Sequence, residues 1–374
     1  MSADKALFSI IVAAHGRERL LMRLLESLVR SREDSGLNME ILVVDSTPAK
    51  ELGAIAEECA HLGAIRIQAP LSVRKKRNIG ASEAQGIWLL FIDSDCEVPV
   101  GFLSAYKRAV DSHDGLRIAA GPTIFRGAET PFTHLIADSS LLAPFRRPSE
   151  AGRTLLWSTT SNLLVNREVF MNAGGFREKL PFLLGGDDTD LCLRLRNAGY
   201  EIVAVPEAEC FHSWATWGHP WAVMKRSARW GWMHSHLLRD YPQYRRIDSP
   251  GLPAHCLATI IIAAAGIISG IWLALFLPVI FATLAILFHA ILAASSDKNH
   301  WRAFRSDLAL AAVELPFGFG RACGSLASGS LVGIFYRLDN NDSFMDVIFP
   351  ETVRALWSDH LAFLVAALLV GGLF

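Results

Sequence analysis

Short apolar runs alternate with amphipathic stretches through the first 125 residues of the chain. Residues 8–14, 39–46, 64–70 and 87–95 are apolar runs that predict buried strands. Leucines at helical spacing follow the first run, a turn and a helix are expected from residue 47, and residues 72–86 predict a further helix. Continuous apolar strands separated by helices are typical of a parallel sheet covered on both faces. The pattern therefore predicts an α/β fold, whose ligands bind at the carboxyl ends of the strands.

The next part of the chain has less regular apolar runs. Residues 118–125, 155–166 and 201–212 predict further strands. A helix is expected between the last two, with Thr189 or Asp190 as its N-cap. No GxGxxG motif follows any strand, so nothing in the sequence supports a dinucleotide-binding site.

The composition changes at residue 257. Residues 257–294 contain no Asp, Glu, Lys or Arg and are interrupted by Pro278. One helix crosses a bilayer with ~20 residues, so this segment predicts a transmembrane hairpin; two core helices of a soluble domain are the alternative. Basic residues flank it on both sides: Lys225, Arg226, Arg229, Arg239, Arg245 and Arg246 before it, and Lys298, Arg302 and Arg305 after it. Both ends are therefore expected on the cytoplasmic side.

These patterns divide the chain into four parts. An α/β domain is expected over 1–224, and a basic, Trp-rich juxtamembrane segment over 225–256. The membrane hairpin at 257–294 is followed by a membrane-associated C-terminal region over 295–374. The formal net charge of −1 indicates no nucleic-acid partner. Six scattered cysteines without a CxxC pair favour reduced thiols in a domain that faces the cytoplasm.

Two carboxylates one residue apart end the run LLFIDSD, at Asp93 and Asp95. Oxygen ligands of this kind suit Mg²⁺ or Mn²⁺, often together with substrate phosphates. The alternative is that these are merely two acids at a strand end.

Three more clusters could belong to the same site. Asp187 and Asp188 precede the helix expected near residue 190, where a carboxylate can act as a general base. His212 follows the last strand and could bind the same metal, although a lone histidine is more often structural. In the stretch VRKKRN, Arg77 and Asn78 could reach a phosphate or base, whereas the preceding lysines fit a solvated helix face.

Taken together, roughly residues 7–235 resemble the inverting family 2 glycosyltransferases, which have the GT-A fold. The resemblance rests on four stretches and the histidine after the last strand; the stretches are 8–28, 40–46, 77–95 and 174–202. It implies a mostly parallel sheet with a Rossmann-like nucleotide-binding half, followed here by C-terminal membrane helices.

The resemblance also implies roles for single residues. Asp45 matches the acid that contacts the nucleotide base, and Asp93 and Asp95 match the metal-binding DxD motif, with Asp95 the firmer ligand. Asp188 matches the general base and His212 a histidine near the metal and the diphosphate. The chain departs from the family's usual residues at 13–16, at Ser46 and at Asp187.

A later stretch, RSARWGW at 226–232, resembles the (Q/R)xxRW motif of membrane-bound polysaccharide synthases in this family. There the motif lines the acceptor end, so Arg226, Arg229 and Trp230 become acceptor-site candidates. An aromatic belt beside the membrane is the alternative use of the tryptophans in this region, and fits Trp217 and Trp221 better.

The function expected from these features is a metal-dependent inverting glycosyltransferase of cell-envelope glycan synthesis. Its donor would be a nucleotide-diphosphate sugar, and its acceptor would be a lipid-linked molecule or a glycan. The protein is expected to be a multi-pass protein of the cytoplasmic membrane, with its catalytic domain in the cytoplasm. A processive exopolysaccharide synthase of the same family is an alternative. A phosphatase of the haloacid dehalogenase type, with Asp93 as nucleophile, is an alternative from another class, and a non-catalytic membrane scaffold is a third.

Overall fold

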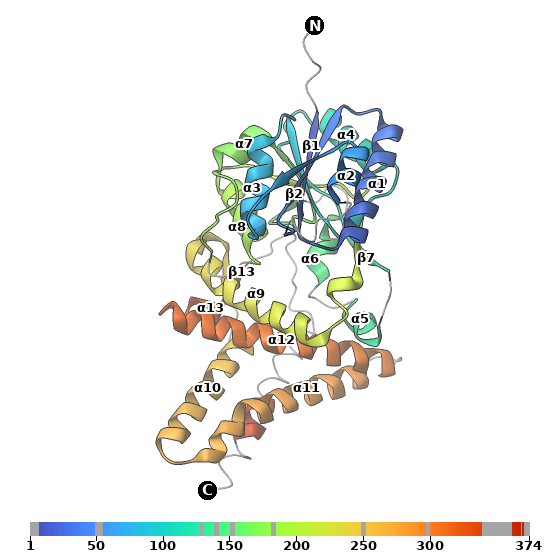
Figure 1. Ribbon diagram of the computed structural model, residues 1–374. Helices are drawn as coiled ribbons and strands as arrows, with labels where there is room; N and C mark the ends of the chain where they lie inside the picture. Colours follow the sequence, from blue (N-terminus) through green and yellow to red (C-terminus); the bar gives the residue numbers. More distant parts are fainter. Residues whose placement is uncertain are drawn as a thin grey trace. The chain divides into compact units, whose positions relative to one another are not determined.

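The computed structural model describes residues 7–48, 55–127, 130–137, 142–149, 154–180, 185–247, 252–296, 300–338, 361–367 and 369. The chain forms two compact units (Figure 1). The first unit comprises Met1–Ala128 and Ala143–Ala215, and the second comprises Glu129–Leu142 and Thr216–Phe374. Each unit is described by itself.

An eight-stranded sheet forms the centre of the first unit, in the order β3-β2-β1-β4-β9-β6-β10-β8. Its strands are β1 (Phe8–Ala14), β2 (Met39–Asp45), β3 (Ala64–Gln68), β4 (Trp88–Asp93), β6 (Ile118–Ala120), β8 (Thr154–Leu155), β9 (Asn162–Asn166) and β10 (Ile202–Ala204). The first four strands in this order are parallel, as the apolar runs predicted. β9 runs antiparallel to both its neighbours and β8 antiparallel to β10, so the sheet is mixed, and less uniformly parallel than expected.

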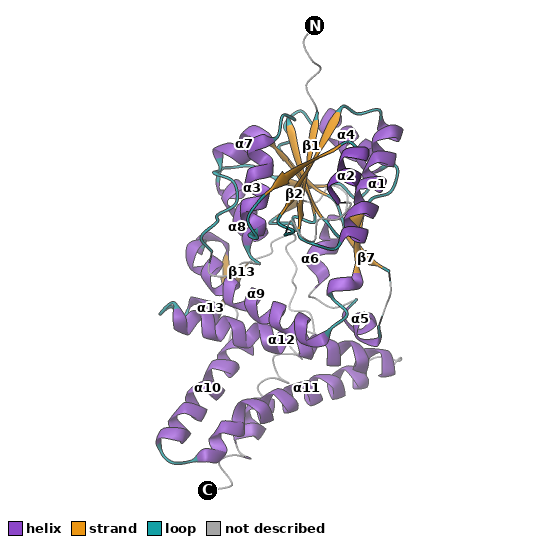
Figure 2. Ribbon diagram, viewed as in Figure 1, coloured by secondary structure: helices purple, strands orange, loops and turns teal. Residues whose placement is uncertain are grey.

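Helices cover both faces of this sheet (Figure 2). One face packs on α1 (Glu18–Ser35) and α4 (Phe102–Ser112), because alternate β1 side chains such as Phe8 and Ile10 join the leucines of α1 in one apolar cluster. The opposite face packs on α3, α7 and α8, where Ile11 joins the second cluster. The three helices on this face are α3 (Val73–Glu83), α7 (Arg167–Asn172) and α8 (Asp187–Asn197). The first unit also contains α2 (Ile55–His61), α6 (Ala143–Arg146) and η3 (Arg147–Ser149).

A small second sheet lies beyond the carboxyl end of β4. It consists of β5 (Cys96–Glu97), β11 (Cys210–Ser213) and β7 (Thr123–Arg126), with β11 in the middle. Its register places His212 opposite Cys96. Residues more than a hundred positions apart in the sequence are therefore neighbours beside Asp95.

The helix α8 begins earlier than the sequence indicated. Its N-cap is Gly186 in a left-handed conformation (φ 74°), without a side-chain cap. The prediction that Thr189 or Asp190 caps this helix is therefore wrong, and Asp187 and Asp188 lie inside its first turn. Asp190 is fully buried and bonds the side chain of Arg194, one turn further along.

The second unit is helical. Its helices are α5 (Pro131–Ile136), α9 (Pro220–Asp240), η5 (Pro242–Tyr244), α10 (Leu252–Ile268), η6 (Trp272–Phe276), α11 (Leu277–Ser296), α12 (His300–Ala327) and α13 (Val332–Phe335). Two strands, β12 (Arg245–Ile247) and β13 (Tyr336–Leu338), pair with each other. The short helix η4 (Trp214–Thr216) lies where the units join along the chain.

The backbones of α9 and α12 are in close contact at glycines. A Cβ on Gly231 would lie 2.0 Å from the Phe317 carbonyl oxygen, and one on Gly320 would lie 2.0 Å from the Ala228 carbonyl oxygen.

The predicted transmembrane hairpin at 257–294 is not supported. Two helices do form there, separated by η6, with Pro278 in the first turn of α11. α10 has 17 residues and is about 25 Å long, less than the ~30 Å of a bilayer core. Among the described residues, no helix combines the length and hydrophobicity needed to cross a membrane. Of the expected C-terminal membrane region, residues 297–299, 339–360, 368 and 370–374 lie outside the described part.

Candidate active site

Carboxylates meet at the carboxyl edge of the parallel strands, within the first unit. In the register of the sheet, Asp45 of β2 lies opposite Ala14 of β1, and Asp93 of β4 lies opposite Ala13. Because β1, β2 and β4 are parallel neighbours, their ends form one edge, where ligands of such sheets bind. The expected position of the acidic residues is thus reproduced by the fold.

Asp95 and His212 form the centre of the candidate metal site. Nε2 of His212 is 3.2 Å from Oδ1 of Asp95, and both side chains are about 6% exposed. Ligand atoms of Asp95, Cys96 and His212 all lie within 4.8 Å of one another. The structure therefore brings together two of the three predicted ligands and adds Cys96, which the sequence analysis did not single out.

The hydrogen bonds of His212 indicate that this pair fits a cation. Its Nδ1 lies 2.9 Å from the carbonyl oxygen of Ser213, which can only accept, so Nδ1 carries a hydrogen. In neutral imidazole the lone pair is then on Nε2, and it faces the Asp95 carboxylate. Two facing lone pairs need a proton or a metal ion between them, and metal-binding histidines commonly donate their other N–H to a carbonyl.

Cys96 is a poor third ligand in this state. Burial and its thiol neighbour Cys210 raise the pKa of the Cys96 thiol well above its ordinary value, so the thiol stays protonated. Neither thiol is in a disulfide, nor is any of the other four cysteines, all of which lie in the described part of the chain. A carboxylate with an imidazole therefore remains as the donor set, compatible with Mg²⁺ or Mn²⁺.

Asp93 is held by Arg77 instead of lying in this cluster. The Arg77 guanidinium is 8% exposed and donates from Nη2 to Asp93 (2.9 Å) and from Nη1 to Asp187 (2.8 Å). It also lies over the ring of Phe176. Arg77 was expected to reach a phosphate or base; the structure places it as a bridge between two carboxylates from β4 and α8.

Asp188 has the properties of a general base. Burial and the neighbouring Asp187 carboxylate raise the pKa of Asp188 to about 7, although Arg77 and the amide of Thr189 act in the other direction. A carboxylate with a pKa near the working pH is suited to accept a proton from a substrate hydroxyl. Asp187 is held in a buried ion pair with Arg77, so Asp188 is the acid of the two that can exchange a proton.

Asp45 is already fully hydrogen-bonded. Its Oδ1 accepts from the amide and hydroxyl of Thr47 (2.9 and 2.6 Å), and its Oδ2 accepts from Nε of Arg66 (3.0 Å) and forms an ion pair with Nη2 of the same residue (2.9 Å). Burial alone would raise the pKa of Asp45, but these donors lower it. The carboxylate would contact a base only by exchanging one of these bonds, so in this state it organises the end of β2.

Lys76 is a buried cation that the sequence analysis placed on a solvated helix face. It is 3% exposed, and its Nζ donates to the Ala14 carbonyl oxygen (2.6 Å) and to the Ser46 hydroxyl (3.0 Å). Burial lowers the pKa of Lys76 to about 8. The solvated-face interpretation is therefore wrong for Lys76: it caps the ends of β1 and β2, where the nucleotide was expected. A lysine in a helix pattern gives no signal of this, since its side-chain length allows either direction.

Asn78 positions a loop. Its side chain donates to the Phe176 carbonyl oxygen (2.9 Å) and accepts from the Phe176 amide (2.8 Å). These two bonds tie α3 to the segment before α8. The predicted substrate contact of Asn78 stays a prediction.

The three acceptor-site candidates lie on α9 in the second unit. The Arg226 guanidinium stacks over the Trp217 ring at 4.1 Å, and the rings of Trp217 and Trp230 are 6.1 Å apart. Trp217 is only 2% exposed, so it packs beneath Arg226 and is not available to an aromatic belt. Arg229 lies on the same helix.

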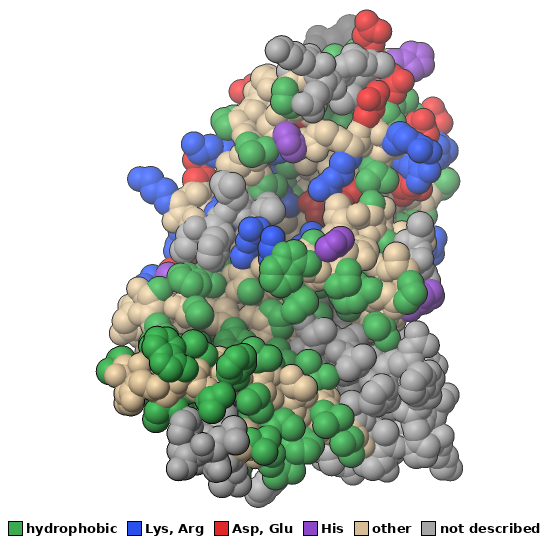
Figure 3. Space-filling model, turned by 60° about the horizontal axis from the view of Figure 1, so that its bottom comes forward, with side chains coloured by type: hydrophobic (Ala, Val, Ile, Leu, Met, Phe, Trp, Pro, Cys, Tyr) green, Lys and Arg blue, Asp and Glu red, His purple; other side chains and the backbone are tan. Residues whose placement is uncertain are grey.

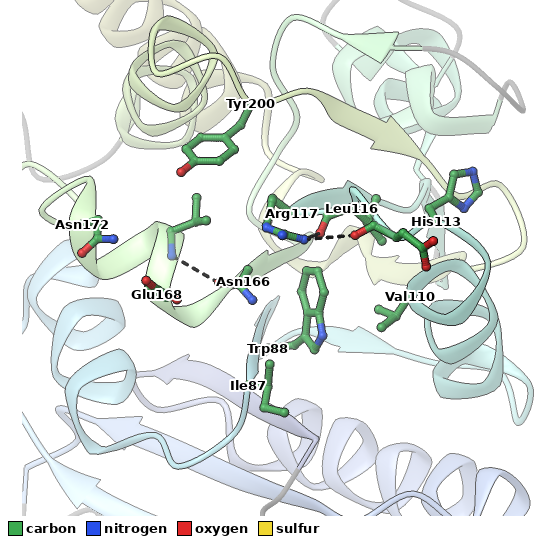
Figure 4. A pocket seen from close by; sticks show the side chains of 12 residues that line it. Ile87, Trp88, Val110, His113, Leu116, Arg117, Asn166, Glu168, Asn172 and Tyr200 are labelled. Carbon is green, nitrogen blue, oxygen red and sulfur yellow. Dashed lines mark hydrogen bonds between the residues drawn. The ribbon is translucent and has the colours of Figure 1, made fainter.

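A pocket of about 540 Å³ lies at the other end of the strands (Figure 4). Its lining includes Trp88 at the start of β4 and Asn166 at the end of the antiparallel β9, together with Arg117 and Tyr200. Since Trp88 begins the strand that Asp93 ends, this pocket is on the edge opposite to the carboxylates. It is therefore separate from the candidate active site.

A family model described as "Glycosyl transferase family group 2" matches residues 88–295 of the chain. The O-antigen biosynthesis protein RfbC of Myxococcus xanthus is 27% identical over 226 residues, which are 54% of this chain and 17% of that protein. A protein of Haemophilus influenzae named "Uncharacterized glycosyltransferase" is 24% identical over 193 residues, 50% of this chain and 62% of that protein. The chain thus spans less than two thirds of the length of either relative.

Among solved structures, the chain is similar to mannosyltransferase PcManGT from Pyrobaculum calidifontis, solved in complex with GDP-Man and Mn²⁺. The TM-score is 0.52 at 16% sequence identity, and the match covers 83% of this chain and 87% of that chain. At this identity the likeness shows a shared fold. It agrees with the GT-A type of fold that the sequence motifs implied.

Proposed function

The chain belongs to glycosyl transferase family group 2, and we propose that it transfers a sugar from a nucleotide-diphosphate sugar to an acceptor hydroxyl with inversion at the anomeric carbon. The observation that carries this proposal is the placement of Asp188, with its pKa of about 7, in one unit with the strand-end carboxylates Asp93 and Asp95. The phosphatase alternative is dropped, because the matched family segment includes Asp93.

In the proposed reaction Asp188 takes the proton of the acceptor hydroxyl. The oxygen attacks the anomeric carbon from the face opposite to the diphosphate, and the bond between that carbon and the diphosphate oxygen breaks. Above pH 7 most Asp188 is ionised and can accept the proton. Arg77 holds Asp93 and Asp187 in place on either side, which orients the first turn of α8 toward the strand ends.

Asp95 and His212 would hold a divalent cation, Mg²⁺ or Mn²⁺. Asp93, which is paired with Arg77, is assigned as a supporting ligand from the motif alone. When bound, such an ion supplies Lewis-acid stabilisation of negative charge on the leaving nucleoside diphosphate. The convergence of the Asp95 carboxylate and the Nε2 lone pair of His212 supports this assignment. The similar mannosyltransferase was solved with Mn²⁺ and GDP-Man bound, which agrees with it.

The nucleotide would lie over the ends of β1 and β2. The ammonium group of Lys76 has three hydrogens, and its described partners, Ala14 and Ser46, accept two of them. The third would be available to the nucleotide. Asp45 organises the neighbouring turn. We assign Arg226, Arg229 and Trp230 to the acceptor as a proposal from the motif alone.

The acceptor is proposed to be lipid-linked, or a growing glycan of the cell envelope, presented at the cytoplasmic face of the membrane. Large apolar side chains of the second unit support this: Ile268 is 87% exposed, Trp272 66% and Val279 63%. Figure 3, whose view brings the lower end of Figure 1 forward, shows hydrophobic side chains gathered at that end. Exposed apolar patches of this kind mark sites of contact with proteins or membranes. The free cysteines agree with a catalytic unit in the cytoplasm.

A donor screen tests the proposal. The purified chain is expected to bind one of the UDP-, GDP- or dTDP-sugars in a metal-dependent way, measured by calorimetry, and to hydrolyse it slowly without acceptor. Asp95→Ala should lose the metal-dependent part of donor binding. Asp188→Asn should bind donor normally but transfer ~10²–10⁴-fold more slowly. Transfer at the normal rate by a folded Asp188→Asn variant would contradict the assignment of the base.

A further inference from the structure

Arg17 has an uncommon backbone conformation at the start of α1. Its φ is 56°, and it is the one non-glycine residue with a positive φ in the part of the chain that the structure describes. The neighbouring amide of Gly16 donates to the Thr47 hydroxyl (2.7 Å), and the amides of Leu20 and Leu21 donate to the Arg17 carbonyl oxygen. Local strain of this kind persists only where surrounding contacts hold it, and it is found at functional sites.

The side chain of Arg17 reaches the candidate metal ligand. Its Nη1 is 3.0 Å from Oδ2 of Asp95, and the side chain is 50% exposed, whereas Asp95 is 6% exposed. The other carboxylate oxygen of Asp95, Oδ1, faces Nε2 of His212 at 3.2 Å. The two oxygens of one carboxylate thus have different partners: Oδ1 faces the imidazole, and Oδ2 faces a long, half-exposed cationic side chain.

This arrangement has an electrostatic consequence for a cation at Asp95 and His212. The guanidinium bound to Oδ2 would be a positive charge on the same carboxylate as a divalent ion, so the two repel each other. An anionic diphosphate beside both cations offsets that repulsion, and guanidinium groups bind phosphate oxygens well. The exposed side chain of Arg17 is long enough to turn from Asp95 toward such an anion.

We propose that Arg17 couples metal binding to donor binding: it weakens the binding of a free divalent cation and strengthens the joint binding of the cation and a nucleoside diphosphate. The inference rests on the proposed function, since it takes the metal site at Asp95 and His212 as given. In this role the Arg17 guanidinium contacts the Asp95 carboxylate without donor and the diphosphate with donor bound. A purely structural salt bridge would change stability but would leave the ratio of the two affinities unchanged.

The test measures Mn²⁺ binding by electron paramagnetic resonance, without nucleotide and with saturating UDP or GDP, on the full chain. Arg17→Gln is expected to bind free Mn²⁺ ~3- to 10-fold more tightly than the wild type and to gain less affinity from the nucleotide. Both differences should shrink in high salt, because the Arg17 side chain is half exposed. Arg17→Lys keeps the charge and should retain most of the coupling.

Two controls separate the possible results. Arg19→Gln removes the same charge from an exposed position two residues away and should change both affinities less than about twofold. Arg17→Gly removes the charge and suits the positive φ, so it gives a well-folded second variant.

Equal coupling in the wild type, Arg17→Gln and Arg17→Gly would overturn the inference and leave the proposed function intact. Absence of Mn²⁺ binding by the wild type, even with nucleotide, would overturn the metal site and this inference with it. Loss of Mn²⁺ binding in Asp95→Ala confirms that the signal reports on this site.

Discussion

Asp187 and Asp188 are adjacent acids with different surroundings. Asp187 forms a short ion pair with Arg77 and lies 3.9 Å from Arg74, both of which are buried. Asp188 accepts a hydrogen bond from the amide of Thr189. Burial and the charge of Asp187 raise the pKa of Asp188 to about 7. Asp187 is thereby held in place by arginine contacts, and Asp188 can exchange a proton near neutral pH.

The raised pKa of Asp188 predicts opposite effects of pH on stability and on activity. The folded chain holds this proton more tightly than the unfolded chain, whose ordinary value is 3.8. The resulting stabilisation is complete below that value and is lost as the pH rises through 7. We expect kcat/KM for transfer to rise through pH 7 as the base ionises, while the free energy of unfolding of the wild type falls relative to Asp188→Asn by about 1–3 kcal/mol between pH 4 and 8.

Denaturant unfolding at both pH values and a pH–rate profile check this prediction. Asp114→Asn, at an exposed carboxylate lining the pocket on the opposite edge of the sheet, is the matched control and should show neither effect. A pH-independent stability difference between the wild type and Asp188→Asn would show that Asp188 ionises normally.

Single residues also show the limits of prediction from sequence. Asp93, Asp95 and His212 were identified because they follow apolar strands, and strand ends meet at a sheet edge. The contacts of Arg17 and Lys76 could not be identified, because a long cationic side chain turns either to solvent or to an acceptor that the fold brings near. That acceptor is a carboxylate for Arg17, and a carbonyl oxygen and a hydroxyl for Lys76.

At the scale of elements, the strand and helix types followed from hydrophobic periodicity, but the boundaries of α8 did not. The helix begins at a left-handed glycine and not at a side-chain cap. Antiparallel β9 (Asn162–Asn166) is a nearly continuous buried run, as are the parallel strands β1, β2 and β4. Its direction is set by the connections before and after it, so periodicity could not reveal that the sheet is mixed.

Glycines in α12 allow close helix packing within the region that was expected to be membrane-associated. Ala at position 320 would normally favour a helix by about 1 kcal/mol. Because its Cβ would lie 2.0 Å from the Ala228 carbonyl oxygen, we expect Gly320→Ala instead to destabilise the second unit by about 2–4 kcal/mol. Thermal unfolding followed by circular dichroism measures the effect.

Gly318→Ala, in the same helix, is the matched control. Its Cβ would meet the branched end of the Leu252 side chain at 3.0 Å, which can move, so the loss should be less than about 1 kcal/mol. Equal losses in the two variants would mean that α9 and α12 are not packed as described.

At the scale of the whole molecule, the apolar segment 257–294 is divided between core and surface. Leu277, Phe281 and Ala285 are buried in the core of the second unit, whereas Ile268 and Trp272 are exposed. An apolar sequence does not show which of its side chains are buried and which are exposed, because a hydropathy value describes each side chain alone and not the residues packed around it. The membrane-surface proposal depends on the exposed set alone.

Vesicle binding tests that proposal. The full chain is expected to co-sediment with vesicles of phosphatidylglycerol and phosphatidylethanolamine, and Ile268→Asp to reduce the bound fraction at least about fivefold, since a charge is costly among acyl chains. Ile268 is 87% exposed, so the substitution should leave folding intact. Val100→Asp, at a position 50% exposed in the first unit, is the control and should bind as the wild type does. Unchanged binding by Ile268→Asp would remove this segment from any role at a membrane.

The sequence by itself determined the class of the fold and placed acidic residues at the strand ends, because buried strands and helical stripes are local patterns with a fixed period and the strand-end acids directly follow them. The tertiary structure alone decided which of these residues are partners. Asp95 meets His212 across β5 and β11, and Arg77 joins Asp93 to Asp187, over separations of up to 117 residues. Such pairings depend on strand register and helix packing, which no local pattern encodes.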